Sequence, residues 1–194
     1  MDLSLDTVVS VALGLGLAAA AGFRVFVPLL VLNLAARWGY VPLAAGWEWV
    51  GGTPALIVFA SATVLEIGGY YIPWLDHALD TVATPAAVIA GMVTTASVMG
   101  DLPPLVKWTA VLVGGGGLAA LVQGSTVAMR AGSTAVSGGL ANPLVATLET
   151  FGASLLAVVA IALPLVALVL VVIVVAAIYR IGRWMLMRVK RPAA

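Results

Sequence analysis

The longest uncharged run constrains this chain most. Residues 150–179 form 30 successive positions without a charged side chain. A helix of that length is about 45 Å long, whereas the hydrocarbon core of a bilayer is about 30 Å thick. The run predicts a membrane-spanning segment that tilts, bends or divides, and Pro164 is the expected break because proline removes a backbone donor. If Glu149 lies inside the protein, residues 143–179 would instead supply two short spans hinged at Pro164.

Shorter charge-free runs fill most of the remaining chain. Charged residues make up 9% of the sequence, against about 25% in soluble domains, so they are too few to cover a water-facing surface. A soluble enzyme and a nucleic-acid-binding protein are therefore excluded. We expect an all-α, polytopic transmembrane helix bundle of about six spans in a single domain, residues 1–194. The first five spans are predicted at residues 7–23, 49–65 with an extension to 71, 81–100, 108–129 and 131–148. Tryptophans and tyrosines, Tyr70 among them, fall at the ends of these runs, which predicts an interfacial aromatic belt.

Basic residues concentrate at the C-terminal end. Five of the nine lysines and arginines lie in the last fifteen positions, whereas all eight acidic residues precede Phe151. The positive-inside rule therefore predicts a cytoplasmic tail at residues 183–194, and binding of anionic lipid headgroups is an alternative use of the same charges. The N-terminal sequence MDLSLDTVV carries no basic residue, which favours a retained first span over a cleaved signal peptide.

Two breaks interrupt the apolar sequence. Residues 22–28, GFRVFVP, follow the first span, and the next piece, residues 29–36, is too short to cross a bilayer. Residues 131–143, AGSTAVSGGLANP, form a similar break in the second half. Non-helical backbone at membrane depth must be buried in protein or line a wet cavity. The breaks therefore predict re-entrant or discontinuous helices, with ordinary interfacial loops as the alternative.

The two halves of the chain resemble one another weakly. GLGLAA at residues 14–19 matches GGGLAA at 115–120, and ATVLEIGG at 62–69 matches VATLETFG at 145–152, in the same order. These matches predict two repeats, residues 5–100 and 104–182, each with three spans and therefore inverted in the membrane. A five-span chain with its N-terminus outside is the alternative.

Four charged residues fall inside apolar sequence, where an ionised side chain is costly unless it is paired or faces water. They are Arg24, Glu66, Arg130 and Glu149. We expect Arg24 to pair with Glu66, and Arg130 with Glu149, near the interface of the repeats. A pathway for an ion or proton is the functional interpretation. Buried structural pairs that fix helix packing are the alternative.

Hydroxyl and amide side chains gather around Arg130. Two Gly-Ser-Thr triplets eight residues apart, with their neighbours, form the most polar part of the apolar sequence. The candidate pathway residues among them are Gln123, Ser125, Thr126, Ser133, Thr134 and Asn142. Such groups can replace a hydration shell. Arg130 would favour an anion, whereas Glu66 and Glu149 would favour a cation or proton. Close helix packing on small residues is the alternative.

Other chemistry has weaker support in the sequence. Asp76, His77 and Asp80 follow the tripeptide IPW at a membrane boundary, and they are weak candidates for a metal site or proton relay. No Ser/His/Asp or zinc-hydrolase spacing occurs, and cysteine is absent. We therefore expect no enzyme, no cofactor and no thiolate chemistry.

Three segments resemble a known family. GFRVFVPLLVLNLAA, ATVLEIGGYYIPWLDHALDTVATPAAVIAG and GSTAVSGGLANPLVATLE are similar to a bacterial family of small polytopic membrane proteins, domain of unknown function 4126. The resemblance covers most of residues 14–152, and EIGGYYIPWLD is its most specific stretch. The resemblance implies a multi-pass protein of the bacterial inner membrane. It provides no activity and no catalytic residues that could be carried over to this chain.

The leading functional hypothesis is a channel or transporter for an ion or small solute, with its pathway between the two halves. One alternative is a translocase for lipid or polyprenyl phosphate, motivated by the buried arginines and the breaks. The other is a non-transporting assembly or partner-binding protein. Besides the lipid bilayer and a transported solute, the narrow core predicts a homo-oligomer, such as a dimer.

Overall fold

The computed structural model describes residues 5–72, 75–100 and 102–189, and these are helical without any strand. The side chains of residues 76, 77, 185, 186, 188 and 189 also lie outside the described part. The elements in chain order are α1 (Leu5–Phe23), α2 (Phe26–Arg37), η1 (Glu48–Gly51), α3 (Thr53–Gly69), α4 (Leu75–Val98), α5 (Pro104–Thr109), η2 (Ala110–Gly116), α6 (Gly117–Ser137), α7 (Asn142–Ala162) and α8 (Pro164–Val189). Five helices in this part of the chain are long and apolar enough to cross a membrane. The helical membrane bundle expected from the sequence is confirmed.

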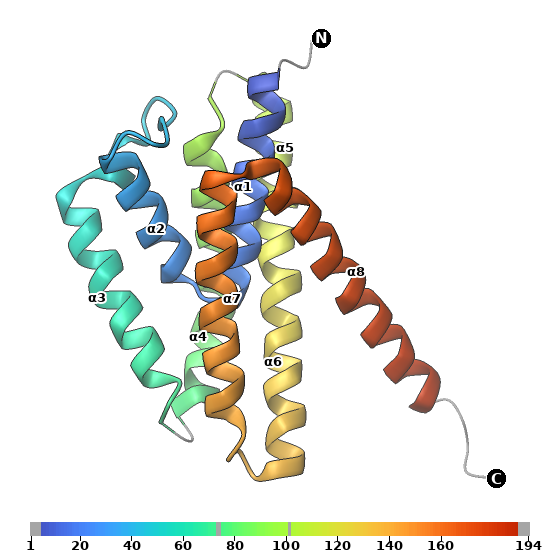
Figure 1. Ribbon diagram of the computed structural model, residues 1–194. Coiled ribbons are helices and arrows are strands. Elements are labelled where there is room, and N and C mark those ends of the chain that lie inside the picture. Colours follow the sequence, from blue (N-terminus) through green and yellow to red (C-terminus); the bar gives the residue numbers. More distant parts are fainter. Residues whose placement is uncertain (1–4, 73–74, 101, 190–194) are drawn as a thin grey trace.

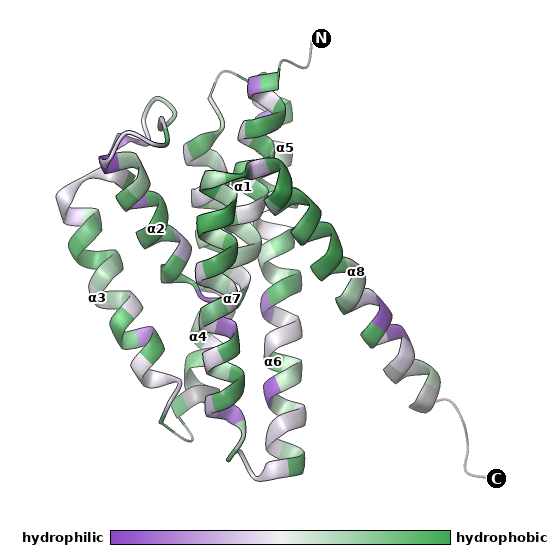
Figure 2. Cartoon of the chain, in the orientation of Figure 1, coloured by the Kyte–Doolittle hydropathy of each residue, from purple (hydrophilic) through white to green (hydrophobic). Residues whose placement is uncertain are grey.

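Helix α1 forms the centre of the bundle. It packs against α4, α6, α7 and α8, and Figure 1 shows it surrounded by these helices. The alanines at positions 18–21 are fully buried. Small side chains allow neighbouring helices to approach closely, which is a main source of association energy within lipid. The outer faces remain apolar, and the hydrophilic positions of α3, α6 and α7 form isolated bands in Figure 2.

The first predicted break separates α1 from α2. Only residues 24–25 leave the helical conformation, and α2 then runs back toward the end of the bundle at which α1 begins (Figure 1). Helix α2 has 12 residues, or about 18 Å, which is too short to cross a hydrocarbon core of about 30 Å. The chain then continues through the loop of residues 38–52 into α3, which runs down the bundle.

The second predicted break is shorter than expected. Residues 104–137 form one continuous 34-residue helix through the π-helical segment η2, and only residues 138–141 turn before α7 begins. The predicted spans at 108–129 and 131–148 are therefore wrong. The helix continues to Ser137, whose hydroxyl donates to the Ser133 carbonyl, and the Thr134 Oγ1 accepts a hydrogen bond from Asn142 at the start of α7. Gly138 and Gly139 supply the left-handed turn with positive φ angles, a conformation that glycine adopts easily.

The break at Pro164 is confirmed. Helix α7 ends at Ala162 and α8 begins at Pro164, where a missing backbone N–H costs nothing because the first turn would leave it unbonded. Glu149 is 2% exposed, so the two-span alternative, with that glutamate in the interior, is correct. The run at 150–179 divides at Pro164, as predicted, but its first helix begins at Asn142 rather than at residue 150.

Helix directions bear on the predicted repeat. In Figure 1, the matched segments in α1 and α6 run the same way, whereas those in α3 and α7 run in opposite directions. An inverted repeat would reverse every matched pair. The repeat therefore stays a prediction, and these directions do not support it.

Glycines allow α4 and the η2–α6 helix to cross at close range. A Cβ atom added to Gly91 in α4 would lie 2.6 Å from the Gly115 carbonyl oxygen and 2.7 Å from the Ala119 Cβ. The reverse holds at Gly115, whose added Cβ would lie 2.7 Å from the Gly91 oxygen. Helix α4 therefore crosses the η2–α6 helix backbone against backbone, and both positions require glycine.

We predict that Gly91→Ala destabilises the protein by about 1–3 kcal/mol, because the methyl group would force the two backbones apart. The measurement is thermal unfolding of the purified protein in detergent. Gly124→Ala is the matched control, since nothing lies near that glycine in α6, and alanine should there raise helix stability by up to about 1 kcal/mol. Equal melting temperatures for the two variants would contradict the close crossing.

Candidate functional site

Glu66 holds the start of α2. Its Oε1 accepts a hydrogen bond from the Val25 backbone N–H at 2.7 Å, and its Oε2 accepts one from the Phe26 N–H at 3.0 Å. The first N–H groups of a helix lack intrahelical partners and carry partial positive charge, so a carboxylate from α3 satisfies them. Among the described residues, no ion pair joins Arg24 to Glu66. The expected Arg24–Glu66 pair is wrong.

Arg24 reaches into α7 instead. Its Nη2 lies 3.2 Å from the Glu149 Oε2 and donates a hydrogen bond of 2.9 Å to the Ala146 carbonyl. Its Nε donates to the Thr150 Oγ1 at 3.0 Å. Arg24 is 1% exposed. The break after α1 thus directs the Arg24 guanidinium toward α7. There it contacts Ala146, Glu149 and Thr150, which lie on one face of the helix.

Arg130 joins α6 to two other helices. Its Nη1 donates to the Glu149 Oε2 at 2.6 Å, and its Nη2 donates to the Asp80 Oδ1 at 2.5 Å. The expected Arg130–Glu149 pair is confirmed. Asp80, which stands on α4, extends the pair into a chain of charges that also includes Arg24, because both guanidiniums contact the same Glu149 oxygen.

Tyr70 lies among these charges. The Arg24 and Arg130 guanidinium carbons lie 4.0 Å and 4.4 Å from the centroid of its ring, within the range of a cation–π interaction. Its hydroxyl donates to the Asp80 Oδ1 at 3.0 Å. Sequence reasoning placed Tyr70 in an interfacial aromatic belt. The missed signal was its spacing, because Tyr70 follows Glu66 by four positions, one turn of a helix.

We call these six residues the charged cluster: Arg24, Glu66, Tyr70, Asp80, Arg130 and Glu149. Three carboxylates and two guanidiniums give it a formal charge of −1 when all are ionised. Its members come from α3, α4, α6, α7 and the segments beside α1 and α3. Arg24 Nη1, Arg130 Nε and Glu149 Oε1 are buried without a hydrogen-bond partner. The cluster therefore has both positive and negative groups that can still bind.

A polar stripe on α6 continues from the cluster. Gln123, Thr126 and Arg130 are buried at i, i+3 and i+7, a spacing that places them on one helical face. Ser133 and Thr134 follow at the next turn, where the Asn142 Nδ2 donates to the Thr134 Oγ1 at 2.9 Å. The Gln123 Nε2 and Ser133 Oγ have no hydrogen-bond partner.

The hydroxyls of Ser125 and Thr126 donate hydrogen bonds within α6. Ser125 donates to the Val122 carbonyl at 2.6 Å, and Thr126 donates to the Gln123 carbonyl at 2.9 Å. Their oxygens retain lone pairs that can accept further hydrogen bonds. Ser125 lies beside the stripe and is only partly buried.

The charged cluster reaches the protein surface at one place. An open pocket of about 300 Å³ is lined by Asp80, Thr81, Thr84, Val127, Arg130 and Ala131. The Asp80 side chain is 14% exposed, whereas that of Glu149 is 1% exposed. The cluster therefore lies nearest the surface at Asp80, while Arg130, Glu149 and Arg24 are buried behind it.

Of the three weak metal candidates, the structure describes only the side chain of Asp80. The side chains of Asp76 and His77 lie outside the described residues. Asp80 contacts Arg130 and Tyr70 within the charged cluster. Within the described part of the chain, no three His, Asp or Glu side chains gather as a metal site.

We predict that Arg130→Met destabilises the protein by about 3–5 kcal/mol, because Glu149 and Asp80 would both lose a buried partner. The free energy of unfolding in detergent is the measurement. Arg37→Met is the control, since Arg37 is exposed and bonds only to the Gly51 carbonyl and Thr53 hydroxyl among the described residues. A similar small effect for both variants would show that the cluster contributes no stability.

Comparison with known proteins gives one match. A model of the family described as domain of unknown function (DUF4126) matches residues 11–184, nearly the whole chain. No curated protein and no solved structure matches this chain. The resemblance noted from the three sequence segments is confirmed, and roles for individual residues must come from the geometry above.

Proposed function

The chain belongs to the DUF4126 family, and from its own buried residues we propose that it is a membrane channel or transporter for an ion or small solute. The observation that carries the proposal is the charged cluster, which is buried among membrane helices and opens to a pocket at Asp80 and Arg130. Ionisable residues inside a membrane protein are expensive and commonly mark ion or proton pathways.

Stability alone gives a weak reason for such a cluster. Replacing a buried ion pair by apolar residues of similar size is often neutral or stabilising. A bundle held only by packing would therefore do without Asp80, Arg130 and Glu149. Their unpartnered donor and acceptor atoms and the polar stripe on α6 support a role in binding a passing solute.

The charge count favours one class of solute. The cluster has one more carboxylate than guanidinium, and Asp80 is the carboxylate nearest the pocket. A proton or small cation would neutralise the excess negative charge, whereas an anion would add to it. We therefore propose proton or cation movement, with Asp80 at the mouth and Glu149 behind it.

We predict that the reconstituted protein carries protons or monovalent cations across liposomes, and that Asp80→Asn lowers this flux by about tenfold or more, because the carboxylate at the mouth is removed. Ion-sensitive dyes inside the vesicles provide the measurement. Glu48→Gln is the matched control, since this carboxylate lies on the exposed loop and bonds the Gly46 N–H.

An absence of flux for every ion tested, under any gradient, would refute the proposal. Accelerated flipping of a labelled lipid in the same vesicles would then support the translocase alternative. If the ion flux of the Glu48→Gln variant falls as far as that of Asp80→Asn, the lower flux does not depend on the position of Asp80.

We also propose that the α1–α2 pair is re-entrant and that the 17-residue α3 crosses the membrane, so that α3, α4, the α5–α6 helix, α7 and α8 make five crossings. By length and composition alone, α1 is long enough to cross and α3 is one of the shorter apolar helices. This topology is supported by the short α2 and by its return toward the start of α1 (Figure 1). With the basic C-terminal end in the cytoplasm of a bacterial inner membrane, the N-terminal end lies outside.

The absence of cysteine allows a direct test of this topology by single-cysteine labelling. We predict that Leu5→Cys and Ala45→Cys react with an impermeant maleimide added outside intact cells, because both lie at the outer end. Leu140→Cys, at the turn before α7, should react only after the membrane is permeabilised. Labelling of Leu5→Cys and Ala45→Cys from opposite sides would show that α1 crosses the membrane completely and would favour six spans.

A further inference from the structure

Helix α8 carries a second group of charged residues, which is exposed, whereas the charged cluster is buried. Its first half packs on the bundle through Ala167 and Val171, which are buried. Val174, Val175 and Ile178 are partly buried against the same core, and the helix diverges from α6 and α7 toward its C-terminal end, as Figure 1 shows. Its later described side chains are exposed or only partly buried. The second half of α8 is therefore open to whatever surrounds the bundle.

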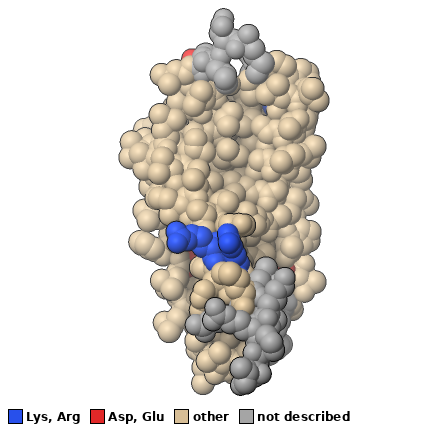
Figure 3. Space-filling view, turned by 90° about the vertical axis from the view of Figure 1, so that its right-hand side faces the viewer, with Lys and Arg blue, Asp and Glu red and all other residues tan. Residues whose placement is uncertain are grey.

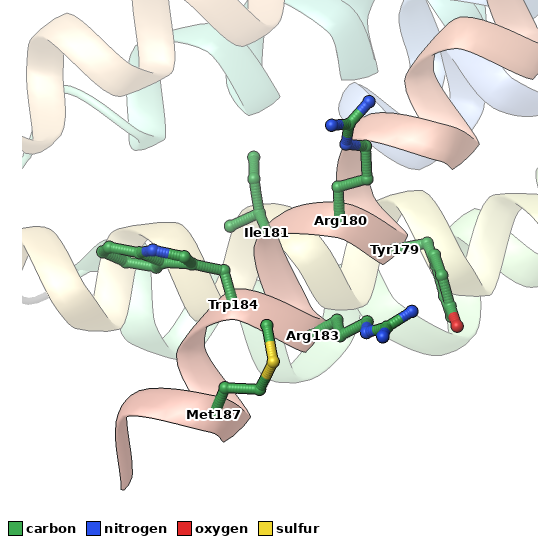
Figure 4. A pocket seen from close by; sticks show the side chains of 6 residues that line it. All are labelled: Tyr179, Arg180, Ile181, Arg183, Trp184 and Met187. Atoms are coloured by element: carbon green, nitrogen blue, oxygen red, sulfur yellow. The ribbon is translucent and has the colours of Figure 1, made fainter. Parts of the chain in front are cut away.

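Two arginines stand on this open part. An open, shallow space of about 700 Å³ lies along α8 itself, beside Tyr179, Arg180, Ile181, Arg183, Trp184 and Met187. Figure 4 shows these side chains projecting from successive turns of α8, with Arg183 and Tyr179 extending toward one side and Trp184 toward the other. We call this surface the basic hollow. It combines cationic groups with aromatic and thioether side chains.

The positive charge of the basic hollow is uncompensated. Among the described residues, no carboxylate pairs with Arg180 or Arg183, in contrast to the buried arginines. Figure 3 shows this face as a largely uncharged surface with one blue patch. The sequence adds Arg188, Lys190 and Arg191 after the hollow. An exposed cationic patch of this kind attracts a negatively charged partner.

The position along α8 indicates what that partner is. Arg180 and Arg183 follow Pro164 by 16 and 19 residues, which is about 24 Å and 29 Å of helix, close to the thickness of a hydrocarbon core. Arginine side chains extend from such positions to the headgroups. Tyrosine and tryptophan favour the same boundary, and Tyr179 and Trp184 flank the arginines.

We propose that the basic hollow is a binding site for the phosphate headgroup of an anionic phospholipid in the leaflet at the C-terminal end. Arg180 and Arg183 donate to the phosphate oxygens, for which the guanidinium geometry is well suited. Ile181 and Met187 contact the upper acyl chains. This proposal does not depend on transport, because it concerns a different surface.

The test titrates the full-length protein in mild detergent with phosphatidylglycerol, and native mass spectrometry counts the bound lipid. Arg180→Gln with Arg183→Gln should weaken binding by about tenfold or more, because two charges near a headgroup are removed. Arg37→Gln with Lys107→Gln is the matched control. This control removes the same amount of positive charge from other helices, at Arg37 on α2 and Lys107 on α5. It should leave lipid binding unchanged.

Two further arms make the outcome decisive. Arg180→Lys with Arg183→Lys should retain more binding than the glutamine pair, since positive charge remains. Phosphatidylcholine, which has no net charge, should bind more weakly than phosphatidylglycerol to the unaltered protein. The proposal is overturned by equal binding of both lipids, by an unaffected glutamine pair, or by an equal loss in the Arg37 and Lys107 control.

Discussion

One carboxylate oxygen organises the interior of this protein. The Glu149 Oε2 contacts Arg24 at 3.2 Å and Arg130 at 2.6 Å, so a single atom on α7 joins the end of α1 to α6. A charge in a membrane interior must be paired or reach water. Glu149 provides that pairing for both arginines, and Asp80 provides a second partner for Arg130. The relative positions of the central helices are thereby specified by charge as well as by the close contact of small residues.

The break after α1 and the burial of charge are connected. Ending α1 at Phe23 exposes N–H groups at the start of α2, which lipid cannot satisfy. Glu66 supplies its carboxylate to two of them, and α3 is thereby held against the break. The same break turns Arg24 toward α7. A continuous helix at this point would leave no N–H groups for Glu66 to accept from, so the irregular backbone and this glutamate form one arrangement, whereas Glu149 would still pair with Arg130.

The sequence predicted the buried residues better than the helix limits. Arg24, Glu66, Arg130 and Glu149 were identified by their apolar surroundings, and all four are buried. Charged residues were also taken as ends of spans, however, which divided one helix at Arg130 and another at Glu149. A charge ends a span only if it has no partner inside the protein. That partner belongs to another helix, so local sequence cannot reveal it. For the same reason, Asp80 was taken for a metal candidate and Tyr70 for an interfacial residue.

The arginines illustrate how environment assigns different uses to one side chain. Arg24 and Arg130 are buried, share carboxylates and lie over an aromatic ring, so their charge is largely committed to the fold. Arg180 and Arg183 are exposed and have no carboxylate among the described residues, so theirs remains available to a ligand. Asp80 stands between these extremes, because it is paired with Arg130 and still borders an open pocket. A group that is both held in place and accessible can exchange a partner without disturbing the helices that position it. This combination is why the mouth of the charged cluster, rather than its fully buried centre, is the place at which a solute would first be bound.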